Sequence, residues 1–172
     1  ANNNTVTYDG QAHGEAGYKT ERLAKGHKVS TVTIDGSKTG VGTYTDLLEP
    51  HDAKIVDAQG EDVTKNYEIT YVKGTLTIEP KKVTITAKDA SKEYDRKALT
   101  QPEFTTTALE EGDTHKFTVK MTENSTITEV GTQANVIATV DGEAVTTGEA
   151  KQIGNYLVTT VDGTLAITAN QT

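Results

Sequence analysis

The side chains that could carry chemistry in this chain are four histidines and many carboxylates, since the sequence contains no cysteine. The histidines are His13, His27, His51 and His115, and no two of them have the spacing of a metal motif. None stands beside a serine as in a nucleophile elbow. Without cysteine the chain also lacks disulfides, thiolate ligands and thiol nucleophiles. We therefore expect ordinary surface histidines and no catalytic residue, metal site or cofactor.

Two acidic turns each gather carboxylates around a glycine. They contain Asp57, Glu61 and Asp62 in one case and Asp141 and Glu143 in the other. Such oxygens could hold calcium weakly, but neither turn follows the twelve-residue EF-hand pattern. Aspartate bonding to its own turn backbone is the favoured interpretation. A glycosidase carboxylate pair is not expected, because a small β module has little room for a deep cleft.

Composition and charge narrow the class of protein. The chain has 172 residues and a formal charge of −8, and its basic residues are dispersed among acids, so we expect no binding to nucleic acid or to an anionic membrane. No apolar run approaches the about 18–20 residues of a membrane-spanning helix, so no membrane insertion is expected. Threonine, a strand former, accounts for 32 residues, whereas proline accounts for 3. These features predict a soluble, acidic, all-β protein.

The chain repeats itself, first at a spacing of 86 residues and then at 89. The matching segments include Tyr8-Asp9 with Tyr94-Asp95, Val41-Gly42-Thr43 with Val130-Gly131-Thr132, Asn66-Tyr67 with Asn155-Tyr156, and Gly74-Thr75-Leu76 with Gly163-Thr164-Leu165. Three extra residues between Gly112 and Val130 account for the change of spacing. We call two residues equivalent when these spacings pair them. The repeat predicts two tandem small β modules, residues 1–79 and 80–172.

The second module opens with a predicted strand, residues 82–90, in which Val83, Ile85 and Ala87 alternate with polar residues. The equivalent positions of the first module fall mostly before Ala1. We therefore expect its opening strand to be missing, with either the loss tolerated or another segment filling the gap, because an open sheet edge is a pairing liability. Pro80 and the absence of glycine at residues 78–83 predict a stiff junction and a rod-like pair.

Short strands separated by turn signals every ~8–12 residues favour a small sandwich or barrel. A hairpin is expected near the end of each module, with turns at Lys73-Gly74 and at Asp162-Gly163, the latter a type I′ signal. Further strands are predicted at residues 31–34, 116–120 and 133–140, the last before an Asp141-Gly142 turn. No helix of ten or more residues is predicted, and only residues 21–28 could form one helical turn.

Aromatic side chains are the usual anchors of a sugar-binding face, and the chain has seven Tyr, two Phe and no Trp. Six of them occupy equivalent positions, which we attribute to module architecture: Tyr8 and Tyr94, Tyr18 and Phe104, Tyr67 and Tyr156. Tyr44, Tyr71 and Phe117 have no aromatic counterpart, so they are the predicted contacts if either module binds a ligand. Their alternative interpretation is partly buried strand residues.

Several segments together carry a family resemblance: residues 60–78, 82–95 and 109–113, with Val130-Gly131-Thr132, Asn155-Tyr156 and Gly163-Thr164-Leu165. They resemble MBG-type repeats, which occur in tandem in large surface proteins and adhesins of bacteria, notably gut Firmicutes. The resemblance implies β-grasp-like modules, no catalytic motif, and a secreted, cell-wall-attached parent protein. The absence of a predicted helix favours an Ig-like sandwich instead, with a β-grasp-like variant as the alternative.

The second copy departs from the pattern of these repeats at two places. Arg96 stands where glycine is typical, as Gly10 is in the first copy, and residues 148–152 replace the Asp62-Val63-Thr64 form. Both loops are therefore expected to differ in conformation between copies. Because surface proteins of Gram-positive bacteria often carry Lys–Asn isopeptide bonds, a crosslink between Lys88 and Asn155 is a minor further hypothesis.

The sequence thus predicts a non-catalytic spacer pair of a bacterial surface protein or adhesin, projecting a binding domain from the cell wall. Its partners would be neighbouring modules of the parent chain. The alternative is a binding module for a host glycan, mucin or protein, and an enzyme is the weakest hypothesis.

Overall fold

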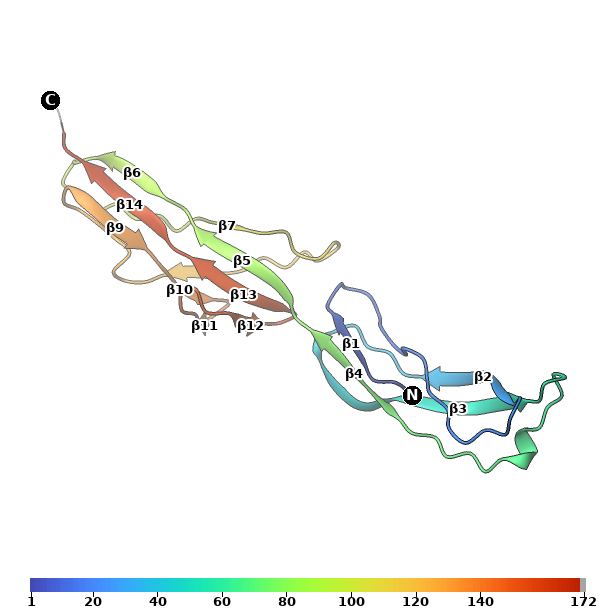
Figure 1. Cartoon of the computed structure of the whole chain (residues 1–172). Helices are drawn as coiled ribbons and strands as arrows, with labels where there is room; N and C mark the ends of the chain where they lie inside the picture. The colour runs from blue at the N-terminus through green and yellow to red at the C-terminus, as the bar shows by residue number, and fades with distance from the viewer. Residues whose placement is uncertain (171–172) are drawn as a thin grey trace. The chain divides into compact units, whose positions relative to one another are not determined.

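A computed structural model describes residues 1–170, and the chain divides into two compact units. Unit one is Ala1–Glu79 and unit two begins at Pro80, the boundary at which the repeat divides the sequence. The described residues are nearly all β, which confirms the all-β prediction, and their several sheets are consistent with a sandwich (Figure 1). None of the helices among the described residues is long and apolar enough to cross a membrane.

Unit one contains one four-stranded sheet in the order β1-β4-β3-β2. Its elements are β1 (Asn4–Thr7), β2 (Lys28–Asp35), β3 (Gly42–Val56), the 3-10 turn η1 (Thr64–Asn66) and β4 (Gly74–Glu79). The long strand β3 pairs with β4 through its first half and with β2 through its second half. The strand predicted at residues 31–34 is therefore confirmed as part of β2.

Unit two contains three sheets, in the orders β12-β13-β5-β7, β6-β14-β9 and β11-β10-β8. Its strands are β5 (Lys81–Ala87), β6 (Ala90–Glu93), β7 (Phe104–Thr106), β8 (Val119–Met121), β9 (Gly131–Asn135), β10 (Ile137–Val140), β11 (Glu143–Ala144), β12 (Lys151–Ile153), β13 (Tyr156–Val161) and β14 (Gly163–Thr168). The predicted alternation of β5 is confirmed, since Val83, Ile85 and Ala87 are all buried.

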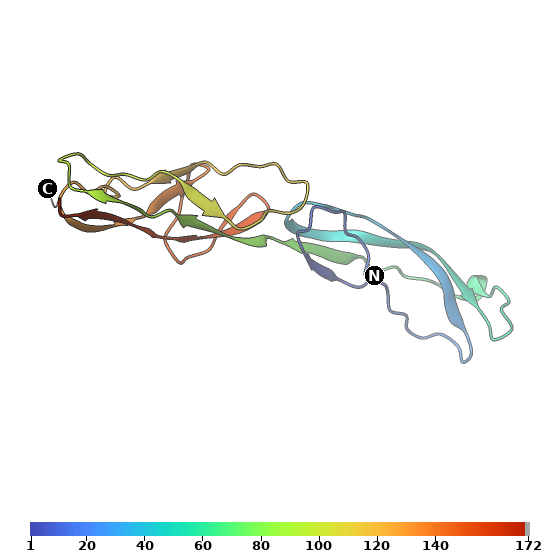
Figure 2. The same cartoon turned by 90° about the horizontal axis from the view of Figure 1, so that it is seen from above.

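The first and last strands of unit two run side by side and parallel. The ladder begins where Lys81 of β5 faces Tyr156 of β13, and it ends where Glu93 of β6 faces Thr168 of β14. Paired residues are 75 positions apart in the ladder of β5 with β13 and also in the ladder of β6 with β14. The second ladder therefore continues the register of the first, although the two ladders belong to different sheets. Figures 1 and 2 show these neighbouring strands along unit two.

The predicted hairpin at Asp162-Gly163 is wrong. β13 and β14 lie in different sheets and do not pair with each other. A type I′ turn requires positive φ at both central residues, and neither Asp162 nor Gly163 has it. The chain instead continues from one sheet into the next at this dipeptide.

We call the passage of the chain from one sheet into the next at Gly163 the crossing. Glycine is needed there because the backbone of another segment, residues 87–88, lies very close. A Cβ on Gly163 would lie 2.6 Å from the carbonyl oxygens of both Ala87 and Lys88. Beside it, the Thr164 N–H donates to Asp89 Oδ1 at 2.7 Å. The buried amide of Asn135 also donates to the Lys88 carbonyl, at 2.9 Å. The glycine is therefore required by packing between two neighbouring segments rather than by a turn.

Unit one contains the same crossing with equivalent residues. A Cβ on Gly74 would lie 2.5 Å from the carbonyl oxygen of Asn2, and the Thr75 N–H donates to Asn3 Oδ1 at 2.9 Å. β1 then runs parallel to β4, as β6 does to β14. The predicted Lys73-Gly74 hairpin is therefore also wrong, because β4 pairs with β1 and β3.

Residues 67–72 lie outside any strand, although the equivalent residues 156–161 form most of β13. The physical reason is pairing. In unit two β13 lies between β12 and β5, whereas no described strand of unit one takes the position of β5. An alternating sequence without a neighbour to share its hydrogen bonds does not form a ladder.

The local backbone conformation tests four further predictions. Asp141 and Gly142 have φ of 51° and 79° and join β10 to β11, which confirms that turn. Arg96 has a φ of 67°, close to the 77° of Gly10, so the expected difference between these two loops is wrong. No helix forms at residues 21–28, where β2 begins at Lys28. The other loop does differ, since β12 in unit two replaces the region of η1.

Candidate functional site

The three predicted ligand contacts lie in different surroundings. Tyr44 packs against the apolar core of unit one, and its hydroxyl donates to the Gly40 carbonyl at 2.8 Å. Phe117 is buried in unit two, with 8% of its surface exposed. Tyr71 is 41% exposed, and its hydroxyl accepts a bond from the Ala53 N–H at 3.0 Å. Of the three, Tyr71 alone presents an exposed ring.

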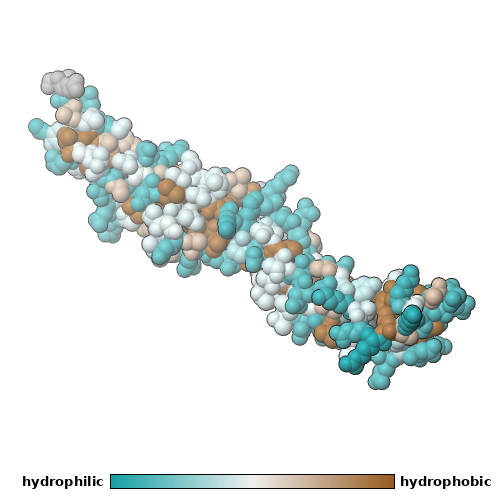
Figure 3. Space-filling model, in the orientation of Figure 1, coloured by the Kyte–Doolittle hydropathy of each residue, from teal (hydrophilic) through white to brown (hydrophobic). Residues whose placement is uncertain are grey.

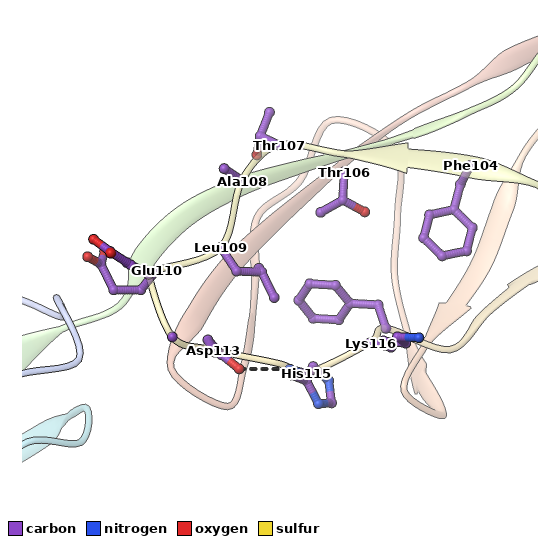
Figure 4. Close-up of a pocket in the computed structure, with 12 residues that line it drawn as sticks. Phe104, Thr106, Thr107, Ala108, Leu109, Glu110, Asp113, His115 and Lys116 are labelled. Atoms are coloured by element: carbon purple, nitrogen blue, oxygen red, sulfur yellow. Dashed lines mark hydrogen bonds between the residues drawn. The ribbon is translucent and has the colours of Figure 1, made fainter.

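A recess in unit two brings together apolar and charged side chains (Figure 4). It is lined by Phe104, Thr106, Thr107, Ala108, Leu109, Glu110, Glu111, Gly112, Asp113, His115, Lys116 and Phe117. Figure 4 shows Phe104 and Thr106 pointing to one side of the segment and Thr107 to the other, which is the side-chain alternation that β7 begins. Leu109, beyond the end of β7, points to the same side as Phe104 and Thr106. The recess therefore has an apolar floor and a polar rim.

Hydrogen bonds occupy the rim of this recess. Asp113 accepts a short hydrogen bond from the Tyr156 hydroxyl and a second bond from the His115 N–H at 2.9 Å, the dashed line of Figure 4. These two bonds hold the pKa of the Asp113 carboxyl below its ordinary value, and the tyrosine hydroxyl is the larger cause. Glu110 pairs with Lys81 at 2.9 Å. Asp113 and Glu110 are thus engaged in holding the loop.

In unit one the equivalent tyrosine holds the equivalent loop, but its hydroxyl contacts a histidine where that of unit two contacts an aspartate. The Tyr67 hydroxyl, equivalent to that of Tyr156, accepts a bond from the Ala24 N–H at 2.9 Å and contacts His27 Nδ1 at 2.6 Å. The alignment pairs His27 with Asp113, and both bind the equivalent tyrosine. In the sequence, the equivalent tyrosines Tyr67 and Tyr156 are the signal that could have indicated this shared contact.

The remaining histidines also have carboxylate partners. His115 Nε2 lies 2.7 Å from Asp141 Oδ2 and His13 Nε2 lies 2.7 Å from Asp9 Oδ1. In each case the histidine ties its own loop to a turn.

His51 has two carboxylate neighbours on the surface of unit one. Its Nδ1 lies 2.7 Å from Asp52 Oδ2 and its Nε2 lies 2.8 Å from Asp35 Oδ2. The bond to Asp52, followed by that to Asp35, raises the pKa of His51 above its ordinary value. The arrangement bridges β2 and β3, since Asp35 ends β2 and the other two residues lie in β3.

One of the two acidic turns bonds to its own backbone, and the other bonds to a segment distant in the sequence. Asp57 Oδ1 accepts from the N–H groups of Gln59 and Glu61 at 2.9 and 3.0 Å. Asp141 Oδ1 accepts from the Thr118 N–H at 2.8 Å. Among residues 1–170, no three histidine or carboxylate side chains come close enough together to hold a metal ion. The predicted bonding of an aspartate to its own turn backbone is therefore confirmed for Asp57, whereas Asp141 joins its turn to the segment of Thr118.

The proposed Lys88–Asn155 crosslink is wrong on geometric grounds. The Asn155 carbonyl accepts the N–H of Lys81 at 3.0 Å, at the beginning of β5. Lys88 follows the other end of that strand, seven residues further along, which at about 3.3 Å per residue is about 23 Å away. The two side chains cannot meet.

The chain matches no family model, no curated protein and no solved structure. The face drawn in Figure 3 is mostly hydrophilic or intermediate, with small separate apolar patches on both units.

Proposed function

We propose that the chain is a pair of non-catalytic spacer modules of a bacterial surface protein or adhesin, projecting a binding domain from the cell wall. The observation that carries this proposal is the parallel ladder between the first and last strands of unit two. The chain enters at Lys81, beside Tyr156, and leaves at Thr168, beside Glu93. These ends are separated by about 12 residue steps of strand, or about 40 Å.

A module with its two ends on opposite sides adds its length to a linear array. Tension on such a module pulls the two parallel strands past each other. The hydrogen bonds of the ladder are then loaded together in shear, rather than broken one after another. This geometry suits a stalk under load, and it needs no ligand site. The cell-surface location and the neighbouring modules as partners rest on the resemblance to MBG-type repeats.

Single-molecule pulling tests the mechanical part of the proposal. Because the chain has no native cysteine, thiols can be introduced at chosen positions for attachment. Lys82→Cys with Thr168→Cys pulls the ladder in shear, whereas Lys82→Cys with Leu157→Cys opens it from one end. We expect a several-fold higher unfolding force for the first pair. Equal forces would contradict a load-bearing role.

The recess of unit two favours binding as a second candidate function. Phe104 is a half-buried residue of its apolar floor, so it is the best residue to test. Selective binding on a glycan array or in a mucin pull-down, lost in Phe104→Ala, would support a binding module. Tyr18→Ala changes the equivalent position of unit one and serves as the matched control.

A further inference from the structure

Strand β2 forms one edge of the sheet of unit one (Figure 1). It pairs with β3 on one side, and among residues 1–170 no backbone bond joins its other side to another segment. Strand β8 has the corresponding place in unit two, where it pairs with β10 alone although β5 is present. The free side of β2 is therefore an edge that a unit containing β5 also has.

The edges of the two units differ in how they are protected. An edge strand can pair with another chain, and proteins usually prevent this with short strands and charged side chains. Strand β8 has three residues and contains Lys120, so it has both protections. Strand β2 has eight residues, and its segment 29–34 contains no charge, no proline and no glycine. Along this segment β2 has neither protection.

A β-bulge decides which side chains of β2 share a face. The residues opposite β2 show that it has one extra residue between Val29 and Thr31. Side-chain burial agrees, because Val29, Val32 and Ile34 are half-buried whereas the other residues of β2 are exposed. The strand has eight residues, so discounting the extra one leaves seven positions, of which Val32 is the fourth and central one.

The backbone of β2 directs hydrogen-bonding groups to its free side. Val29 faces Ile55, and both backbone groups of Ile55 bond to residues 63–64 instead of to β2. Opposite residues of an antiparallel pair either bond to each other or both point away, so Val29 points away from β3. Ile34 faces Pro50, which has no N–H to exchange with it. Val29 and Ile34 therefore offer their backbone groups to a further strand.

We propose that unit one binds a second copy of this chain by antiparallel pairing of β2 with β2 of the copy. The two-fold axis of this pair passes beside Val32, the central position. Lys28 then lies opposite Asp35 of the copy at both ends of the pair, which places opposite charges together. Val29 lies opposite Ile34 of the copy, so the apolar side chains share a face and the free backbone groups meet. The strand is thus complementary to itself, as a two-fold interface requires.

Both charged ends of β2 are accessible for this contact. Lys28 is exposed, and the side chain of Asp35 is 67% exposed. His51 Nε2 contacts Asp35 through Oδ2, which leaves Oδ1 to accept a bond from the lysine of the copy.

Sedimentation equilibrium of the full chain tests the pairing. One added strand edge is a small interface, so we expect a reversible dimer with a dissociation constant of about 10 µM to 1 mM. The dimer should be the largest species, because two-fold pairing occupies the free side of β2 in both copies. A monomer throughout this concentration range, or a series of larger species, would overturn the proposal.

Two charge-reversal variants test the register. Lys28→Glu and Asp35→Lys each place like charges opposite each other at both ends of a homodimer, so each variant alone should dimerise about tenfold more weakly. A mixture of the two variants restores opposite charges at both ends, and its heterodimer should have about the wild-type affinity. Thermal melts of each variant check that unit one still folds. Failure of the mixture to recover the affinity would overturn the register.

Introduced cysteines locate the axis, since the chain has none of its own. Val32→Cys places the two sulfurs on opposite residues, whose Cα atoms lie about 5.5 Å apart and within reach of a disulfide. Val29→Cys is the matched control, because the same residue of the copy lies about 13 Å away along the strand. Mild oxidation should crosslink the first variant at least about tenfold faster than the second. Equal rates would overturn the proposed axis.

Amide exchange distinguishes β2 from the other edges of the chain. Exchange at Val29 and Ile34 should slow as the concentration rises through the dissociation constant, while exchange in β8 stays unchanged. Slower exchange in β8 without slower exchange in β2 would place the contact elsewhere and overturn the proposal.

Discussion

At the residue scale, one tyrosine hydroxyl near the end of each unit anchors a loop. Tyr67 uses His27 for this contact and Tyr156 uses Asp113. A hydroxyl can both donate and accept, so a carboxylate and an imidazole nitrogen are both suitable partners. The residue type can therefore change between units while the contact remains.

The His51 bridge is expected to make the stability of unit one depend on pH. Its folded pKa is raised above 6.5, chiefly by Asp52. Protonated His51 therefore contributes stability that is fully present below about pH 6.5, its ordinary unfolded pKa, and is lost as the pH rises through the folded value. Thermal melts against pH should show this loss, and His51→Gln should remove it.

NMR titration separates the two causes of the His51 shift. Asp52→Asn should lower the pKa of His51 more than Asp35→Asn does, because the bond to Asp52 is the larger cause. A wild-type pKa at or below 6.5 would contradict the bridge.

At the element scale, the crossing from one sheet to the next depends on a glycine without a side chain. Gly74 and Gly163 occupy equivalent places, and in each a Cβ would meet a carbonyl oxygen of the neighbouring segment. Dipeptides such as Asp-Gly are strong hairpin signals in isolation. Here β13 and β14 pair in parallel with β5 and β6, so the chain runs on in the same direction through Asp162-Gly163 and does not turn back.

Gly163→Ala is expected to destabilise unit two by about 2–3 kcal/mol, because the added methyl group must displace backbone rather than a flexible side chain. The matched control is Gly142→Ala. Open space surrounds that Cβ position, so it should lose only about 1 kcal/mol from the left-handed backbone. Denaturant unfolding measures both. A smaller loss at Gly163 than at Gly142 would mean that the crossing relaxes.

At the scale of the whole molecule, the two units have related sequences, but fewer of the related segments are paired as strands in unit one than in unit two. In unit two β5 pairs with both β13 and β7, whereas the equivalents of those two strands in unit one, residues 67–72 and 18–20, belong to no strand and carry half-buried and exposed side chains. Burial of apolar surface is the main favourable contribution to folding. Unit one, whose residues 67–72 are less buried than their equivalents in unit two, should therefore have the smaller free energy of unfolding.

Calorimetry should therefore resolve two transitions, with unit one melting first. Ile78 and Ile167 are equivalent core residues, 1% and 2% exposed, which allows each transition to be assigned. Ile78→Val should lower the midpoint temperature of the first transition only, and Ile167→Val that of the second only. Each substitution should reduce the free energy of unfolding of its own unit by about 1 kcal/mol. If Ile78→Val lowered the higher transition instead, the order of stability would be reversed.

Much of the fold was predictable from local patterns. The all-β class follows from threonine-rich alternation without a helical period, and the Asp141-Gly142 turn from its residues. The candidate site was less predictable. Phe117 lacks an aromatic equivalent but is buried, and the recess around it is formed by the path of residues 104–117, which no spacing rule reveals.

The sequence by itself determined the all-β class, the boundary at Pro80 and the equivalence of residues 86 or 89 apart, because periodicity and repetition can be recognised in the chain without its fold. Only the tertiary structure decided which strands are neighbours. Residues 67–72 and 156–161 have similar alternation, yet only the second segment is a strand, since β5 lies beside it and no described strand of unit one lies beside the first. A strand exists through hydrogen bonds to its neighbour, and that neighbour is supplied by the fold.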